Sequence, residues 1–286
     1  MWIALAINGT MLAVGIAGGI VTGSLAVLAD AGHVLSDVGS IALALVAAGL
    51  ASRPAGGRRT FGYQRSEVLA ALVNGLLLVA VAVGIAIAAL GRFGDPPEID
   101  GAGVLALGLF GLAGNVAAAV VLARGQREDV NLEGVLRHSV ADALGSLGVI
   151  VAGAVVLAGG SPIVDPVAGL LIAALVLASS WRLIFEPVNV LMEAAPSGLD
   201  PDQMGEAICS EEGVRSVHEL HVWTVTAGFG ALAAHVVVVR DADRDLIRRR
   251  LELLLHERFG IDHTTLQMEE EAGEALLQVE RAARNP

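Results

Sequence analysis

The sequence is short of cysteine, lysine and aromatic residues. Among its 286 residues there is one cysteine, Cys209, and no lysine, and aromatics make up 3%. A single cysteine excludes a disulfide framework and a multi-cysteine zinc site. The net charge of −12 argues against a nucleic-acid partner, because such a partner requires a basic surface.

Charged residues are also scarce, at 17% of the chain against roughly 25% in an ordinary soluble domain. Hydrophobic residues make up 55% and the mean hydropathy is +0.68, which excludes a disordered chain. The charge is unevenly divided, because residues 1–195 carry a net −4 and residues 196–286 a net −8. We therefore expect a membrane domain over 1–195 and an acidic cytoplasmic domain over 196–286.

Six segments of the first part are long and apolar enough to cross a bilayer, which takes about 20 residues. Polar or Pro- and Gly-containing breaks separate them, as in the arginine-rich segment 52–66. The sequence therefore predicts a bundle of six transmembrane helices, over about 2–24, 28–50, 68–91, 101–123, 133–158 and 163–184.

Arginine placement predicts the orientation of these helices. Eight arginines lie in or beside the breaks after the second, fourth and sixth segments, and Arg92 alone lies on the opposite side. Because cytoplasmic loops carry the excess of basic residues, we expect both termini in the cytoplasm and a multi-pass protein of the cell (inner or plasma) membrane.

The second part is predicted to be a small ferredoxin-like α+β domain. A helix is expected over 201–212, and two strands over 214–225 and 231–239. A second helix over 244–258 and a third strand over 261–268 complete an α-β-β-α-β order. Residues 272–286 suit either a short helix or a frayed tail.

Two predicted spans contain the same pair of ionisable residues. His33 and Asp37 lie in the second span, and His138 and Asp142 in the fifth. A spacing of four residues puts each pair on one helix face. Because ionisable groups within a membrane are costly, they indicate function. If the two faces meet, they form an N₂O₂ set that suits tetrahedral Zn²⁺.

Other interpretations of these polar residues remain open. Each His–Asp pair could be a hydrogen bond that locks two helices. Asp30 could cap the second helix, or it could lie on an ion or proton path. Asn74 and Asn115, inside the third and fourth spans, are expected to hydrogen-bond between helices.

The sequence resembles the cation diffusion facilitator family, in the branch with His-x-x-x-Asp in two spans. The motifs that carry the resemblance are Gly23–His33, Phe61–Glu67, Asp165-Pro166, Leu191–Pro196, His218–Trp223 and Ala234-His235. The resemblance implies a homodimeric Zn²⁺ exporter driven by proton antiport, not an enzyme, with Zn²⁺ as substrate and as a ligand of the cytoplasmic domain. It does not fix the choice among Zn²⁺, Cd²⁺, Co²⁺ and Mn²⁺.

The resemblance also implies functional residues outside the spans. It places metal ligands of the cytoplasmic domain at His218 and His235, and a carboxylate at Glu269 would complete that site. Gln267 stands where some relatives have histidine, which leaves the ligand set open. Simple hydrogen-bonded strand histidines are the alternative. At the membrane boundary the resemblance pairs Arg65 with Glu193 as a hinge, against the alternative of two solvated charges.

Two other function classes fit some of these features. A membrane metalloenzyme could use the same four ligands, but catalytic zinc keeps an open position and no His-Glu-x-x-His or Gly-x-Ser-x-Gly motif is present. A passive channel or a structural membrane protein with a metal-sensing tail is the third class. Movement of Zn²⁺ against its gradient distinguishes a transporter from a channel.

Overall fold

The structure is a computed structural model that describes residues 2–125, 132–226 and 228–270. Within its helices, the side chains of residues 2–4, 119, 121–125 and 132–141 lie outside that description. The chain divides into two compact units, Met1–Val188 and Asn189–Pro286, and each is described by itself below. The prediction of a helix or tail over 272–286 falls outside the described residues.

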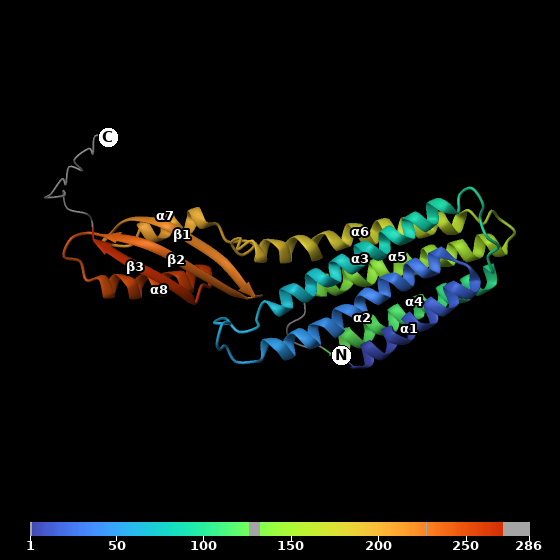
Figure 1. Cartoon of the computed structure of the whole chain (residues 1–286), viewed down its shortest axis with the longest axis horizontal. Helices are drawn as coiled ribbons and strands as arrows, with labels where there is room; N and C mark the ends of the chain where they lie inside the picture. Colours follow the sequence, from blue (N-terminus) through green and yellow to red (C-terminus); the bar gives the residue numbers. More distant parts are fainter. Residues whose placement is uncertain (1, 126–131, 227, 271–286) are drawn as a thin grey trace, which may run out of the picture. The chain divides into compact units, whose positions relative to one another are not determined.

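The first unit is a bundle of long helices (Figure 1). Their bounds are α1 Trp2–Thr22, α2 Leu25–Ala51, α3 Ser66–Gly91, α4 Gly101–Gly125, α5 Leu132–Leu157 and α6 Val164–Leu191. Five starts and five ends lie within two residues of the predicted spans, and α2 begins three residues early. The end of α6 differs most, because this helix passes through Pro187 to Leu191, three residues beyond the first unit, instead of stopping at residue 184.

Five helices are apolar over a length that can cross a membrane: they are α1, α2, α3, α4 and α6. In α5 the described side chains provide a shorter apolar stretch, Asp142–Leu157. Many large apolar side chains of these helices are exposed, including Val21, Leu90 and Leu171, each more than half accessible. Such an apolar exterior is expected of a bundle that faces lipid, and it confirms the predicted α-helical membrane fold.

Helices α4 and α5 pack with their backbones in close contact. A Cβ atom added at Gly153 would lie 2.5 Å from the backbone nitrogen of Leu105, and one at Gly108 would lie 2.9 Å from that of Ile150. Only glycine permits this approach, since any side chain would push the helices apart. Small residues at helix contacts are how membrane helices gain van der Waals contact without a hydrophobic driving force.

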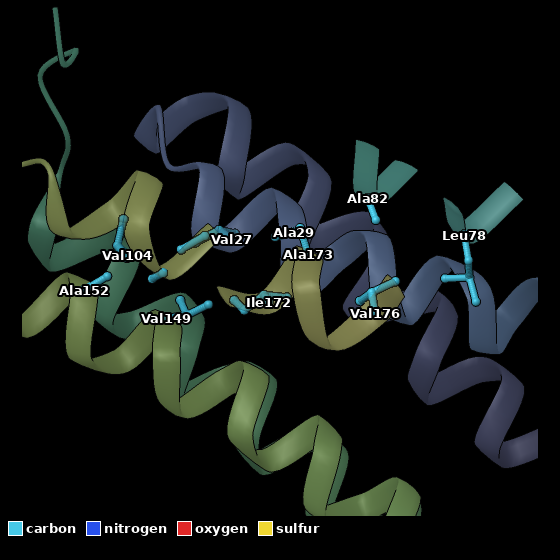
Figure 2. Close-up of a cluster of buried hydrophobic side chains, with 12 residues drawn as sticks. Val27, Ala29, Leu78, Ala82, Val104, Val149, Ala152, Ile172, Ala173 and Val176 are labelled. Atoms are coloured by element: carbon cyan, nitrogen blue, oxygen red, sulfur yellow. The ribbon is translucent and has the colours of Figure 1, made fainter. Parts of the chain in front are cut away.

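Side chains from five helices meet in one buried apolar cluster (Figure 2). Most of its members are Val and Ala, and the labelled ones are Val27, Ala29, Leu78, Ala82, Val104, Val149, Ala152, Ile172, Ala173 and Val176. Because these side chains are small, the helices that carry them can lie close together. The cluster thereby holds α2 and α5 within one compact bundle.

A buried carboxylate fixes the start of α2. Ser24 is the N-cap and its side chain accepts a hydrogen bond from the Val27 backbone N–H. Asp165, at the start of α6, is fully buried and accepts hydrogen bonds from the Ser24 hydroxyl and from the Leu25 backbone N–H at 2.7 Å. The first backbone N–H groups of a helix lack intrahelical partners, and the Asp165 carboxylate accepts hydrogen bonds from two of them. Its negative charge also interacts favourably with the positive end of the helix dipole.

The second unit is a three-stranded sheet with two helices. Its elements are α7 Pro201–Cys209, β1 Val214–Thr226, β2 Phe229–Val238, α8 Arg244–Phe259 and β3 His263–Glu270. The strand order is β1-β2-β3, with β1 antiparallel and β3 parallel to β2. This is the predicted α-β-β-α-β order, although α7 ends at Cys209 rather than at residue 212.

Both helices contribute to the same core on one face of the sheet. Alternate residues of β2, from Leu232 to Val238, are fully buried together with Met204 of α7 and Leu251 of α8. Because successive strand residues point to opposite faces, His235 lies on the other face. That face therefore remains available for a polar site.

The Asp165 contact predicts a measurable loss of stability on substitution. Asp165→Asn replaces an acceptor oxygen by a donor beside the backbone N–H groups of α2, and it removes the charge that faces Arg92 at 3.8 Å. Because hydrogen bonds to charged groups contribute about 1.5–3 kcal/mol, the free energy of unfolding should fall by about 2 kcal/mol or more. Thermal unfolding in detergent measures the change. The exposed loop variant Asp95→Asn is the control, and equal midpoints would contradict the assigned role.

Candidate metal centres

The first candidate centre begins with two side chains of α2. His33 and Asp37 lie four residues apart on this helix, so they share one face, and both are half-buried. Ser24 and Asp165 fix the start of this helix, and this sets the positions of His33 and Asp37 along the helix axis.

Asp142 of α5 meets His33 across the bundle. The distance between His33 Nε2 and Asp142 Oδ1 is 2.7 Å, and the two side chains are 17% and 12% exposed. One potential ligand atom from each of His33, Asp37 and Asp142 lies within 4.8 Å of the others. The structure therefore brings together three of the four residues predicted from the paired motif.

The fourth predicted residue, His138, lies one helical turn before Asp142 in α5, and its side chain is outside the described residues. The described part of the centre offers one imidazole nitrogen and carboxylate oxygens from two residues. Zn²⁺ accepts such nitrogen and oxygen ligands. Since ligands bind metal only when deprotonated, protons and metal compete for them.

Two asparagines orient the helices around this centre. Asn74 of α3 donates to the hydroxyls of Ser36 at 3.1 Å and Ser40 at 2.7 Å, both on α2. Asn115 of α4 donates to Ser146 of α5 at 3.1 Å. These are the interhelical hydrogen bonds expected of both asparagines. Their serine partners were not predicted, although Ser36 and Ser40 share the four-residue spacing that marks one helix face.

Asp30 does not cap α2, in contrast to one of its two predicted roles. The N-cap is Ser24, and Asp30 lies in the second turn because the helix begins three residues earlier than expected. Its side chain hydrogen-bonds Ser146. A Cβ atom at Gly145 would lie 2.9 Å from one of its carboxylate oxygens, so glycine makes the space that this carboxylate fills.

The second candidate centre lies on the sheet face opposite the helices. His218 of β1 and His235 of β2 are directly paired in the strand register, and their ring centroids are 5.0 Å apart. Glu269 of β3 reaches both, with Oε2 3.2 Å from His218 Nε2 and Oε1 2.8 Å from His235 Nδ1. Potential ligand atoms of all three residues lie within 4.8 Å of one another, close enough to hold one metal ion.

The neighbours of Glu269 keep its carboxylate charged and oriented. Hydrogen bonds, the largest from His235 and a further one from Gln267, hold the pKa of Glu269 below its usual value. Gln267 is the register partner of His235 and donates to Glu269 Oε1 at 2.8 Å. Gln267 thus orients a carboxylate oxygen that is a potential metal ligand.

The remaining histidines of this unit lie outside both groups of potential ligands that the described residues form. His221 is exposed on β1. His256 contacts Asp262 at the end of α8, and His263 packs edge-on against Phe229 with ring centroids 5.6 Å apart. Cys209 is exposed at the end of α7.

The two predicted hinge residues lie at helix ends in different units. Arg65 is the N-cap residue of α3 and is half-buried. Glu193 lies two residues beyond the last residue of α6, and its backbone adopts a left-handed conformation with φ 59°. Such a conformation is uncommon for a residue with a side chain and marks a special position in the chain.

The fold and the first centre define a multi-pass membrane protein with a cluster of metal-ligand side chains between its helices. The comparison with protein families identifies its family. Residues 1–192 match the cation efflux transmembrane domain, and residues 196–271 match the cytoplasmic domain of cation efflux proteins. The chain belongs to the cation efflux (cation diffusion facilitator) family of transporters, which confirms the resemblance found in its motifs.

Individual relatives are similar over most of their length. The chain is 38% identical to the cadmium, cobalt and zinc/H⁺-K⁺ antiporter of Bacillus velezensis, over 88% of this chain and 82% of that protein. It is 38% identical to the metal cation efflux system protein CzcD of Cupriavidus metallidurans, over 93% of this chain and 85% of that protein. It is 36% identical to the zinc transporter ZitB of Escherichia coli, over the same two shares.

The cluster of His218, His235 and Glu269 predicts a specific loss of metal binding on substitution. Glu269→Gln keeps the shape of the side chain but removes the charge that contacts both histidines. The Zn²⁺ affinity of one class of sites in the full-length protein should fall by about tenfold or more, the lower end of the loss caused by removing even an outer partner of a ligand. Competition with a chromophoric chelator measures it.

The matched control is Glu257→Gln on α8, which makes the same change of charge at an exposed position of the same unit. This control should bind Zn²⁺ as the unaltered protein does. Binding that is identical in all three proteins would exclude Glu269 as a ligand.

Proposed function

We propose that this protein is a secondary active transporter that exports Zn²⁺ from the cytoplasm in exchange for protons, with Cd²⁺ and Co²⁺ as further substrates. The observation that carries the proposal is the group formed by His33, Asp37 and Asp142 between membrane helices. Ionisable groups in such a position are retained for ion or proton pathways. The printed names of two relatives, an antiporter of cadmium, cobalt and zinc and a zinc transporter, support the substrate class.

The transport site in this proposal consists of His33, Asp37, His138 and Asp142. His138 supplies the second imidazole, since it lies four residues before Asp142 on the same helix. Two nitrogens and two carboxylates give Zn²⁺ four ligands, which leaves no position open for the water that a hydrolytic zinc enzyme requires. A filled coordination shell supports transport rather than catalysis.

Competition between protons and Zn²⁺ couples the two fluxes. The site binds Zn²⁺ when its imidazoles and carboxylates are deprotonated, and proton binding releases the metal. Histidine ordinarily titrates near pH 6.5, so a modest difference in pH between the two sides changes which ligand is bound. A bundle that exposes the site to each side in turn therefore exchanges protons for Zn²⁺.

The second unit is proposed to be a cytoplasmic metal-binding domain in a homodimer. His218, His235 and Glu269 would hold one Zn²⁺ on the open face of the sheet. This part of the chain is acidic, so two copies repel each other until cations reduce the charge. Arginine placement supports both termini in the cytoplasm. Membership of the cation efflux family supports insertion in the plasma membrane.

The transport proposal is tested in proteoliposomes with an imposed pH gradient. Zn²⁺ flux should rise when the gradient drives protons in the direction opposite to Zn²⁺. Asp37→Asn and Asp142→Asn should each reduce flux to that of empty liposomes, because one carboxylate ligand is lost while the helix is retained. A zinc-sensitive dye inside the vesicles records the flux.

Asp95→Asn, which removes a carboxylate from an exposed loop, should transport at the unaltered rate. Flux that ignores the pH gradient would reject antiport. Full activity in a protein that carries both Asp37→Asn and Asp142→Asn would reject the site.

The hinge pair is tested by exchanging its charges. Arg65→Glu or Glu193→Arg alone should slow transport, whereas the protein with both changes should recover part of the rate. Stability should change little, because an ion pair near the surface contributes only about 0–1 kcal/mol. Transport and thermal unfolding are measured on the same preparations. A doubly changed protein that is slower than either single variant would show that the two charges act independently.

A further inference from the structure

The segment between α2 and α3 reverses the sign of the chain's charge. Residues 52–65 contain Arg53, Arg58, Arg59 and Arg65 and no acidic residue, within a protein whose net charge is −12. A segment of this charge repels Zn²⁺ and other cations. Its charge favours an anionic ligand.

This segment is a folded turn. The backbone N–H of Gly56 donates to the Arg59 carbonyl at 3.1 Å, and the N–H of Arg59 donates to the Gly56 carbonyl at 3.1 Å. Gly57, between them, has a φ of 56°, a left-handed conformation that glycine adopts without strain. Arg58 therefore lies at the tip of a two-residue hairpin, next to Arg59.

The aromatic ring of Tyr63 contacts two of the arginines. The guanidinium carbons of Arg59 and Arg53 lie 4.1 and 5.9 Å from the ring centroid of Tyr63. A guanidinium that interacts with an aromatic ring through its flat face keeps its N–H donors at the edge. Residues 52–60 are exposed, so these donors can reach a ligand from outside. Planar N–H forks of this kind match the oxygens of a phosphate group.

The location of the turn indicates where that phosphate comes from. The segment connects Ala51, the last residue of α2, to Ser66, the first residue of α3, and both helices are membrane spans (Figure 1). Because both helix ends reach the surface of the bilayer, the folded turn between them starts and ends at the level of the lipid headgroups. Phe61, in the same segment, is 44% exposed and offers an apolar ring for the interface.

We propose that Arg53, Arg58 and Arg59 form a binding site for the phosphate of an anionic phospholipid headgroup. The chemistry they recognise is a phosphate oxyanion, and its position next to two membrane spans makes the lipid its source. Juxtamembrane clusters of basic residues are attracted to anionic lipid by about 1 kcal/mol per residue. The site rests on the membrane-spanning helices and is independent of the proposed transport of Zn²⁺.

The test uses the full-length protein, stripped of lipid in detergent and titrated with phosphatidylglycerol. The midpoint of thermal unfolding should rise with phosphatidylglycerol and stay unchanged with phosphatidylcholine, which carries no net charge. The variant Arg58→Gln/Arg59→Gln should need about 30-fold more phosphatidylglycerol for the same rise, which corresponds to about 2 kcal/mol at 1.4 kcal/mol per tenfold change.

Two further variants distinguish a local arginine site from a general effect of net charge. Arg240→Gln/Arg249→Gln makes the same change of net charge at exposed positions of the second unit and should respond as the unaltered protein does. Arg58→Lys/Arg59→Lys keeps the charge and should retain most of the response.

Three outcomes would overturn the proposal. Equal loss in both glutamine variants would mean that only net charge matters. A rise with millimolar inorganic phosphate equal to that with phosphatidylglycerol would assign the site to free phosphate. A lower midpoint of Arg58→Gln/Arg59→Gln before any lipid is added, with no difference afterwards, would assign the arginines to a contact within the protein. Because the readout is unfolding, a failure of Zn²⁺ transport would not affect it.

Discussion

A histidine and a carboxylate that face each other between two membrane helices are the constraint around which the first unit is organised. His33 Nε2 lies 2.7 Å from Asp142 Oδ1, and both side chains are largely removed from solvent. An ionisable group in an apolar environment is tolerated only when partners compensate for its lost hydration. The requirement that α2 and α5 keep these groups together restricts how every neighbouring helix can pack.

The packing of the bundle meets that requirement with small residues and few polar contacts. Gly153 and Gly108 let the backbones of α4 and α5 approach closely, and Asn115 joins the same two helices near the centre. The N-terminal end of α2 is held by the buried carboxylate of Asp165. Rigid helices held at fixed positions keep ligand atoms within 4.8 Å of one another without any loop taking part.

The second unit builds its cluster by strand pairing instead of helix packing. Strand pairing places His218 opposite His235, and the parallel third strand brings Glu269 to both. The helices cover the other face of the sheet, so the ligand atoms remain accessible to ions from solution. One centre is thus enclosed by helices, whereas the other lies on an open face of a sheet.

The sequence by itself determined the features that follow from local periodicity. The lengths of the apolar segments predicted six helices, and the four-residue spacing predicted that His33 and Asp37 share a face. Alternation and turn residues predicted the strands of the second unit. Each of these depends only on the geometry of one element, which a chain of residues carries in its own pattern.

Tertiary structure decided the features that depend on how elements rotate and slide against one another. Asp30 has the residue type of a cap, yet Ser24 caps α2, and Asp165 of a distant helix accepts hydrogen bonds at the same place. The serine partners of Asn74 likewise lie on another helix, 38 and 34 residues away in the sequence. No local pattern specifies such contacts, because they arise only when the packing of the whole unit sets the distance between separate elements.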